Sequence, residues 1–159
     1  MGERTPHLDS DCRGIFFGLS AMPQRRDLLR AVMEGVTYSL KDCLVLLQEL
    51  GVDADQIIAS GGGASSEIWL QIQADILGKD VVACAEKEQA CLGACLLAGA
   101  STGIFASLDE GCERFVKMRE KVYHPMPEHQ KVYEEVLGRH IRFFDGCGEG
   151  TMCPVGTGA

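Results

Sequence analysis

The sequence predicts an α/β domain with parallel strands, and three observations carry this prediction. A long amphipathic helix between Pro23 and Gly51 is followed by a short apolar strand at residues 56–60. A glycine-rich turn and a second amphipathic helix then lead to another apolar strand at residues 80–84. Alternation of helix and strand at this spacing is typical of layers in which successive strands run parallel.

The composition is that of one soluble globular domain. The chain has 159 residues, of which 46% are hydrophobic and 24% are charged, and this is enough for one sizeable core. A formal net charge of -8 argues against broad binding to nucleic acid or to an anionic membrane surface. A nucleotide is not excluded, because backbone amides and magnesium can hold phosphate without a basic patch.

Two further absences in the sequence bear on location. No segment reaches the roughly 18 apolar residues that a membrane helix needs. The N-terminal residues contain no apolar stretch of the kind found in signal peptides. We therefore expect a cytoplasmic protein with no membrane partner.

The first helix follows Pro23, a residue that suits the first turn of a helix. Apolar residues recur along it at every third or fourth position, which predicts that this face packs into the core: Leu28, Val32, Val36, Leu40, Leu44 and Leu47. The arginines near its start are predicted to form a solvated face: Arg25, Arg26 and Arg30. Residues 1–22 are predicted to be loop, with one short apolar run at residues 14–19.

The second helix follows a predicted buried strand at residues 56–60, which ends at a run of three glycines. Ser65 or Ser66 can cap this helix, and Gly78 is predicted to stop it. We expect Trp69 in the core, because it shares a helix face with two isoleucines. The apolar residues of the helix are Ile68, Trp69, Ile72, Ile76 and Leu77.

Helices dominate the rest of the chain. Glu88 opens a helix over residues 89–99 that is rich in small residues, and the capping box at residues 107–110 starts another. Pro125 and Pro127 interrupt the chain before a last apolar-periodic helix over residues 132–144. The tail from 146 to 159 has five glycines and no periodicity, so it is predicted to be disordered.

Cysteine and histidine show no spacing that indicates a metal site or a catalytic nucleophile. None of the eight cysteines forms a C-x-x-C pair, and most lie in apolar runs, so we expect reduced, structural thiols. The four histidines have no partner pattern and are predicted to have no catalytic role.

The segment that carries chemistry is the turn at residues 60–66, between a strand and a helix. Its glycines allow close backbone approach to a ligand, and the helix that follows offers free amides. A P-loop is excluded, since no lysine follows the glycines. A dinucleotide motif is a weak match through Gly61 and Gly63, because Ser66 replaces its third glycine, although Glu86 lies near its acidic position. A plain strand-to-helix turn remains the alternative.

A combination of motifs resembles the FGGY family of carbohydrate kinases. Residues 14–19 and 27–34 resemble its C-terminal signature, and residues 60–66 resemble its adenosine motif. The opening segment resembles xylulokinases within that family. The resemblance runs from about residue 2 to residue 144 and also includes 69–78 and 88–94.

The resemblance implies the C-terminal domain of an actin-like, ribonuclease H-like ATPase fold, with several flanking helices. ATP or ADP with Mg²⁺ would then be the cofactor, with magnesium held through the nucleotide phosphates and not by a protein metal site. The nucleotide would contact Gly61, Gly62, Gly63, Ser65 and Ser66. The catalytic aspartate of the family lies in a stretch that this sequence does not match, so no catalytic residue is assigned here.

Relative to such a kinase, the sequence begins where the last third would begin, so we expect residues 1–145 to be an incomplete nucleotide-binding domain. Sugar would then bind only through the N-terminal domain. Self-association is expected, because the two predicted strands lack neighbours. Two alternatives stay open: a non-catalytic adenine-nucleotide-binding or interaction module, and, less favoured, a dinucleotide-binding oxidoreductase fragment.

Overall fold

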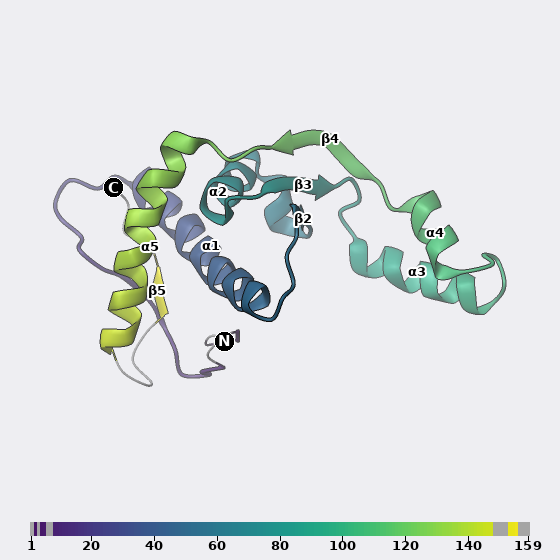
Figure 1. Ribbon diagram of the computed structural model, residues 1–159, viewed down its shortest axis with the longest axis horizontal. Coiled ribbons are helices and arrows are strands. Elements are labelled where there is room, and N and C mark those ends of the chain that lie inside the picture. The colour runs from purple at the N-terminus through teal and green to yellow at the C-terminus, as the bar shows by residue number, and fades with distance from the viewer. Residues whose placement is uncertain (1, 3, 6–7, 148–152, 156–159) are drawn as a thin grey trace.

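The computed structural model describes residues 2, 4–5, 8–147 and 153–155, and its elements confirm the predicted α/β alternation (Figure 1). In chain order they are β1 (Gly14–Phe16), α1 (Arg25–Glu49), β2 (Gln56–Ala59), the 3₁₀ helix η1 (Gly62–Ser65), α2 (Glu67–Leu77), β3 (Asp80–Cys84), α3 (Gln89–Ser101), α4 (Leu108–Phe115), β4 (Met118–Tyr123), α5 (Pro127–Cys147) and β5 (Cys153–Val155). Within this part of the chain, no helix is both long and apolar enough to span a membrane.

The main sheet contains three strands in the order β2-β3-β4. β2 and β3 run parallel, as predicted, with Gln56 opposite Asp80. β4 runs antiparallel to β3 and was not predicted, because its sequence alternates charged and apolar residues weakly and its register shifts near Val82. β2 was predicted to be buried, but its side chains are only half-buried or exposed, since it forms one edge of this sheet.

α2 packs on one face of this sheet, and its ends are capped as predicted. The Ser66 hydroxyl accepts a hydrogen bond from the Trp69 amide, and Gly78 closes the helix in the left-handed region with a φ of 68°. Leu70 and Ala74 on α2 meet the inward side chains of the strands. This core consists of Ala64, Leu70, Ala74, Val81, Ala83 and Tyr123.

α1 and α5 pack on the other side of α2, around a second core of Tyr38, Ile72, Ile76 and Tyr133. The side of α1 that docks here is not the predicted one. Buried residues include Ala31 and Tyr38, whereas four residues of the predicted core stripe are exposed: Val32, Val36, Leu40 and Leu47. α1 therefore carries two apolar faces, and the described residues cover the smaller-residue face.

β1 and β5 form a separate parallel pair, in which Ile15 lies opposite Pro154. The short apolar run at 14–19, predicted as loop, thus contributes a strand, which local sequence could not indicate because its partner lies far along the chain. Residues 153–155 of the predicted disordered tail form this partner strand. Residues 148–152 and 156–159 of that tail lie outside the described residues.

α3 and α4 form a helical hairpin that extends away from the other helices, joined to the sheet at the ends of β3 and β4 (Figure 1). Phe105 closes the hairpin, because its ring lies against Gly99 and Gly111, where a Cβ would meet it at 2.4 and 3.0 Å. Its ring centroid also lies 5.7 Å from that of Phe115. The Ser107 hydroxyl accepts from the Glu110 amide, which confirms the predicted start of α4.

Candidate functional site

The glycine turn connects the end of β2 to the start of α2 and contains η1. Gly61 has a φ of 76°, a conformation that residues with a side chain rarely adopt. Its carbonyl then accepts a hydrogen bond from the Ala64 amide, and the Gly63 carbonyl accepts one from the Ser66 amide. The predicted residues 61–63 and 65–66 are therefore brought together in one compact turn.

The three glycines of this turn differ in whether the fold requires them. Gly61 needs its positive φ. Gly63 lies so close to the Trp69 indole that a Cβ would come within 2.9 Å of the ring. Gly62 is exposed, and a Cβ there would meet no atom within 4 Å. The fold explains Gly61 and Gly63, but it leaves the absence of a side chain at Gly62 unexplained.

The two serines differ in how far they are engaged by the protein. The Ser66 Oγ accepts a hydrogen bond of 3.3 Å from the Trp69 amide, so its hydroxyl is used as the cap of α2. Ser65 is exposed at the end of η1. Ser65 is thus the better placed of the two to face a ligand.

Two side chains that sequence reasoning did not single out form hydrogen bonds with the turn. The Gln89 Oε1 accepts a hydrogen bond of 3.0 Å from the Gly61 amide, and its Nε2 donates to the Glu86 carbonyl. From β4, the Arg119 guanidinium donates to the Ala64 carbonyl at 3.0 Å. No sequence signal could have found Arg119, because it lies on the strand that was not predicted.

An ion pair lies at the first turn of α2. The Lys121 Nζ is 2.6 Å from the Glu67 carboxylate, and this hydrogen bond lowers the pKa of Glu67 and raises that of Lys121. Both side chains are well exposed, so the pair contributes little to stability. It does place a cation about one turn from the glycines.

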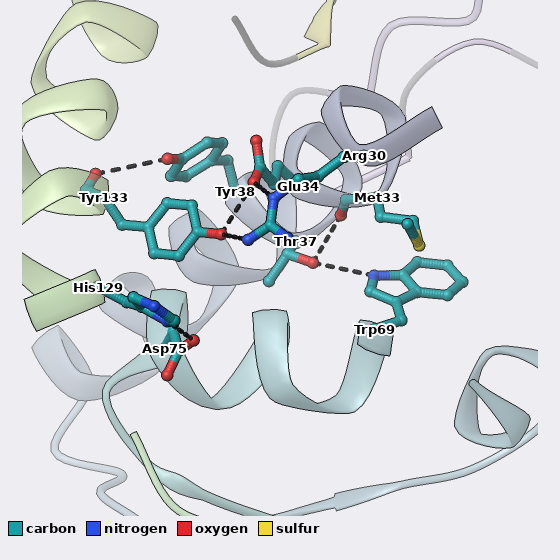
Figure 2. A network of polar contacts seen from close by, with 9 residues as sticks. All are labelled: Arg30, Met33, Glu34, Thr37, Tyr38, Trp69, Asp75, His129 and Tyr133. Atoms are coloured by element: carbon teal, nitrogen blue, oxygen red, sulfur yellow. Dashed lines mark hydrogen bonds and ion pairs between the residues drawn. The ribbon is translucent and has the colours of Figure 1, made fainter. Parts of the chain in front are cut away.

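Behind the turn, Trp69 connects α2 to α1 (Figure 2). Its indole Nε1 donates to the Thr37 hydroxyl at 3.1 Å, and that hydroxyl donates to the Met33 carbonyl at 2.7 Å. Trp69 packs beside the second core, as predicted, but is only half-buried. The ring that limits Gly63 is therefore itself held in place by α1.

A buried polar cluster joins α1 to α5 (Figure 2). The Tyr133 hydroxyl donates to Glu34 at 2.8 Å, and Arg30 donates to both Glu34 and the Tyr133 oxygen at 2.7 Å. Burial, then the nearby Glu34 carboxylate, raises the pKa of Tyr133 to about 12, and the same causes raise that of Tyr38 further. Arg30 was predicted to lie on a solvated face, and its side chain is 48% exposed, although its guanidinium also pairs with a carboxylate from the same helix.

A second buried carboxylate, Asp75, holds the start of α5 against α2 (Figure 2). Its side chain is 1% exposed and lies 2.8 Å from the His129 Nδ1. The same carboxylate accepts hydrogen bonds from the Met126 amide at 2.8 Å and from Gln71 at 2.9 Å. Through these contacts Asp75 positions α5. They lie at the end of α2 opposite the glycine turn.

Across the described residues, no group of three or more His, Cys, Asp or Glu side chains is arranged to hold a metal ion. For recognition of a ligand, the glycine turn offers exposed backbone, an open face at Gly62 and the Ser65 hydroxyl. Such a surface can bind a flat, polar ligand, but it offers no general base or nucleophile.

The chain matches a known protein family over most of its length. The model for the FGGY family of carbohydrate kinases, C-terminal domain, matches residues 1–102. Among curated proteins, a xylulose kinase of Staphylococcus epidermidis is 40% identical over 134 residues, and one of Bacillus subtilis is 37% identical over 137 residues. These alignments cover 84% and 86% of the chain but only 27% of each relative, so the chain spans about a quarter of their length.

Solved structures give the same result. A ligand-bound xylulose kinase from Lactobacillus acidophilus matches with a TM-score of 0.81 and 29% identity, over 94% of this chain and 30% of that one. A glycerol kinase from Plasmodium falciparum, solved with ADP, matches with a TM-score of 0.65 over 80% of this chain and 26% of that one. At 22% identity, this second likeness concerns the fold alone.

Proposed function

The chain belongs to the FGGY family of carbohydrate kinases, and we propose that its glycine turn binds the adenosine part of ATP or ADP. Its fold is the predicted one, that of the C-terminal domain of these actin-like ATPases. The proposed reaction is phosphoryl transfer from ATP to D-xylulose or a related sugar. It would take place in a kinase of which this chain forms the nucleotide-binding part.

The observation that carries the proposal is the open face at Gly62. Packing accounts for Gly63 and backbone geometry accounts for Gly61, but none of the described residues fills the space beside Gly62. A ligand that lies against the backbone there would account for the third glycine. Adenosine is such a ligand, because a flat base and a ribose can approach a backbone that carries no side chains.

Each residue of the turn has a defined part in this proposal. Gly61 and Gly63 shape the turn, and Gly62 provides the surface that contacts the nucleoside. Ser65 offers a hydroxyl to its polar edge, whereas Ser66 is used mainly to cap α2. Gln89 is a positioning residue, because it fixes the Gly61 amide.

The remaining parts of the reaction belong to groups that this chain does not supply. ATP supplies the transferred phosphoryl group, and Mg²⁺ would be held through the nucleotide phosphates. The sugar and the general base would be provided by the part of the kinase that precedes the matched region. This assignment follows the short span of the chain relative to its relatives.

Nucleotide preference and kinase activity distinguish the two alternatives from the proposal. A non-catalytic binding module would bind ADP in the same way but would support no sugar kinase when combined with the rest of an FGGY chain. The dinucleotide-binding interpretation is disfavoured by family membership. That interpretation predicts tighter binding of NADH than of ADP.

Titration of the isotope-labelled chain with ADP, followed by NMR, tests the proposal. We expect saturable shifts at residues 60–66 and in the first turn of α2, with a dissociation constant of about 1 mM, or about 4 kcal/mol. The binding is expected to be weak because the phosphates have few partners here. Parallel titrations with GDP and NADH serve as controls. If shifts at the turn do not saturate, or if NADH produces them at lower concentration, the proposal is wrong.

A further inference from the structure

One face of β4 is turned toward the glycine turn and the start of α2. Side chains alternate along a strand, so Arg119, Lys121 and Tyr123 lie on the same face. Tyr123 is 7% exposed and belongs to the core beneath α2. The two basic residues before it on this face are therefore directed toward α2 and η1.

These two basic residues make different contacts. The Lys121 Nζ pairs with the Glu67 carboxylate on α2, and both side chains are well exposed. The half-buried Arg119 donates from its guanidinium to the backbone carbonyl of Ala64 at 3.0 Å. The hydrogen bond from Lys121 lowers the pKa of Glu67 most, and the charge of Arg119 adds to this effect. Both cations thus lie near α2, but Lys121 binds a side chain, whereas Arg119 binds the backbone of the turn.

The contact from Arg119 connects the turn to the far strand of the sheet. Ala64 is 4% exposed and packs in the same core as Val81 and Ala83 of β3, the strand between β2 and β4. The turn follows β2, and Arg119 lies on β4. The hydrogen bond therefore joins the two outer strands of this sheet through the turn.

The bond also fixes the backbone that leads into Ser65. The Ala64 carbonyl and the Ser65 amide belong to one planar peptide group, so a donor on the carbonyl sets the orientation of both. At the other end of the segment, the Gly61 amide is bonded to Gln89, and the Gly61 carbonyl accepts from the Ala64 amide. Residues 61–64 are thus held at both ends, while Gly62 and Ser65 remain exposed.

Both holding residues lie at the base of the α3–α4 hairpin. Gln89 is the first residue of α3, and Arg119 lies four residues after the end of α4. The two chains are joined at this base, where the Ala85 amide donates to the Lys117 carbonyl at 2.9 Å. A single supported segment of the fold therefore provides both contacts to the turn.

We propose that Arg119 is a positioning residue for the nucleoside at the glycine turn. It fixes the Ala64–Ser65 peptide, so that the Ser65 hydroxyl and the open backbone at Gly62 are presented to the ligand together. It acts with Gln89 and needs no contact with the ligand itself. This inference rests on the proposed nucleoside site, to which it adds a residue from an element that lies far away in the sequence.

Two substitutions on the same face of β4 separate positioning from charge. Arg119→Met removes the donors and one positive charge, and Lys121→Met removes one positive charge two residues away without losing a bond to the turn. The isotope-labelled chains are titrated with ADP and, separately, with adenosine, which carries no phosphate, and binding is followed by NMR. Thermal unfolding of each variant sets a temperature at which the chain is fully folded.

Arg119→Met is expected to weaken the binding of both ADP and adenosine by at least about fivefold, because the turn loses a charged hydrogen bond. Lys121→Met should change adenosine affinity by less than about twofold, since the pair that it removes is exposed. In the free chain, Arg119→Met should also shift the Ser65 amide nitrogen resonance, and Lys121→Met should leave it in place. An arginine that only stabilises the fold would change neither this resonance nor the affinity of the folded chain.

Three outcomes would overturn the inference, and they differ from one another. If Arg119→Met binds adenosine as the wild-type chain does, Arg119 does not position the nucleoside, although the proposed site stands. If both variants weaken ADP binding equally and leave adenosine binding unchanged, the arginine acts only as a charge toward phosphate. If the wild-type chain binds neither ligand, the proposed function fails and this inference fails with it. Arg119→Gln, which is shorter and also uncharged, provides the same comparison should Arg119→Met fail to fold.

Discussion

At the scale of single residues, two glycines of the turn are required by the fold, and the third leaves room for a ligand. Gly61 is set by backbone conformation and Gly63 by the Trp69 ring, whereas Gly62 faces open space. These differences make the three positions independent probes. A side chain at Gly61 or Gly63 is expected to disturb the fold, whereas a side chain at Gly62 is expected to affect only a ligand bound at the turn.

Gly62→Val is expected to weaken ADP binding more than about tenfold while leaving the fold intact. The added Cβ meets no protein atom within 4 Å, and Gly62 does not have a positive φ, so the free energy of unfolding should fall by less than about 1 kcal/mol. NMR titration with ADP and thermal unfolding measure the two effects. Unchanged ADP affinity in this variant would contradict the nucleotide site.

Gly63→Val is the control for this experiment, because its side chain points into the protein. A Cβ there lies 2.9 Å from the Trp69 ring, so the indole must shift and its hydrogen bond to Thr37 is strained. We expect a destabilisation of about 1–3 kcal/mol by overpacking. A variant that unfolds at the wild-type temperature would show that Trp69 does not constrain the turn.

The turn itself could be predicted from the sequence, since a glycine run between a strand and a helix has few other uses. Gln89 and Arg119 could not be predicted, because each reaches the turn from an element distant in sequence. The hydroxyl of Ser66 was open to two roles in the sequence. Only the hydrogen bond from Trp69 shows that it caps the helix.

Tyr133 is expected to make the folded state less stable at alkaline pH. Its pKa is raised to about 12 in the fold, against about 10 in the unfolded chain, so the folded state keeps a proton that the unfolded state loses. Stability from this group is complete below pH 10 and is lost as the pH rises toward 12. Between pH 10 and 11 we expect a fall of about 1 kcal/mol from Tyr133, and a similar fall from Tyr38.

Urea unfolding at a series of pH values from 8 to about 11 measures this effect. Tyr133→Phe should be less stable than the wild-type chain at pH 8, because Glu34 loses a donor, yet its stability should decline less steeply above pH 10. Tyr38 leaves a residual slope in the variant. Equal slopes for the two proteins would contradict the assignment to Tyr133.

At the scale of elements, two aspartate–histidine pairs of equal length allow a matched comparison. Asp75 and His129 are 2.8 Å apart and join α2 to the start of α5, with the carboxylate 1% exposed. Asp80 and His124 are also 2.8 Å apart, but both are exposed, at 38% and 71%. The N–O distances are equal, so burial and the further hydrogen bonds that Asp75 accepts should decide how much each pair contributes.

Asp75→Ala is expected to destabilise the chain by about 2–4 kcal/mol, because the Met126 amide and Gln71 lose their acceptor inside the protein. Asp80→Ala should change stability by less than about 1 kcal/mol. Urea unfolding of both variants at pH 7 provides the measurement. Similar effects from both substitutions would show that Asp75 does not secure α5.

Helices and strands could be predicted where local apolar periodicity defines them. They could not be predicted where pairing with a distant segment stabilises them. α2 was predicted from its own sequence, including its caps at Ser66 and Gly78. β1 was not predicted because it has only three residues and pairs with a distant strand, and β4 was not predicted because its charged and apolar residues alternate only weakly. The periodicity of α1 was recognised, but periodicity does not say which neighbour covers a face.

At the scale of the whole molecule, the fold class was predictable because the helix–strand alternation and the motif spacing agree. The extent of the sheet was not, since a sheet is completed by residues that are distant in sequence. Self-association of the free chain remains a prediction, and the exposed apolar side chains of α1, among them Val32, Val36 and Leu40, give it a physical basis.

The isolated chain is expected to show no sugar-dependent phosphoryl transfer from ATP. It covers 27% of its xylulose kinase relatives, and the described residues at the glycine turn offer no general base, so both positioning and proton transfer are lacking. A coupled assay of ADP release with D-xylulose and with glycerol checks this. Turnover that requires the sugar and disappears in Gly62→Val would contradict it.

Trp69 also provides an intrinsic fluorescence probe. It is the one tryptophan in the sequence, its indole lies against Gly63, and its N–H is bonded to Thr37 on α1. Emission excited near 295 nm therefore comes from a single ring whose two sides report on different events, ligand at the turn and separation of α1 from α2. Nucleotide binding should quench or shift that emission, and acrylamide should reach the ring more readily if α1 detaches, so both processes can be followed in the unlabelled protein.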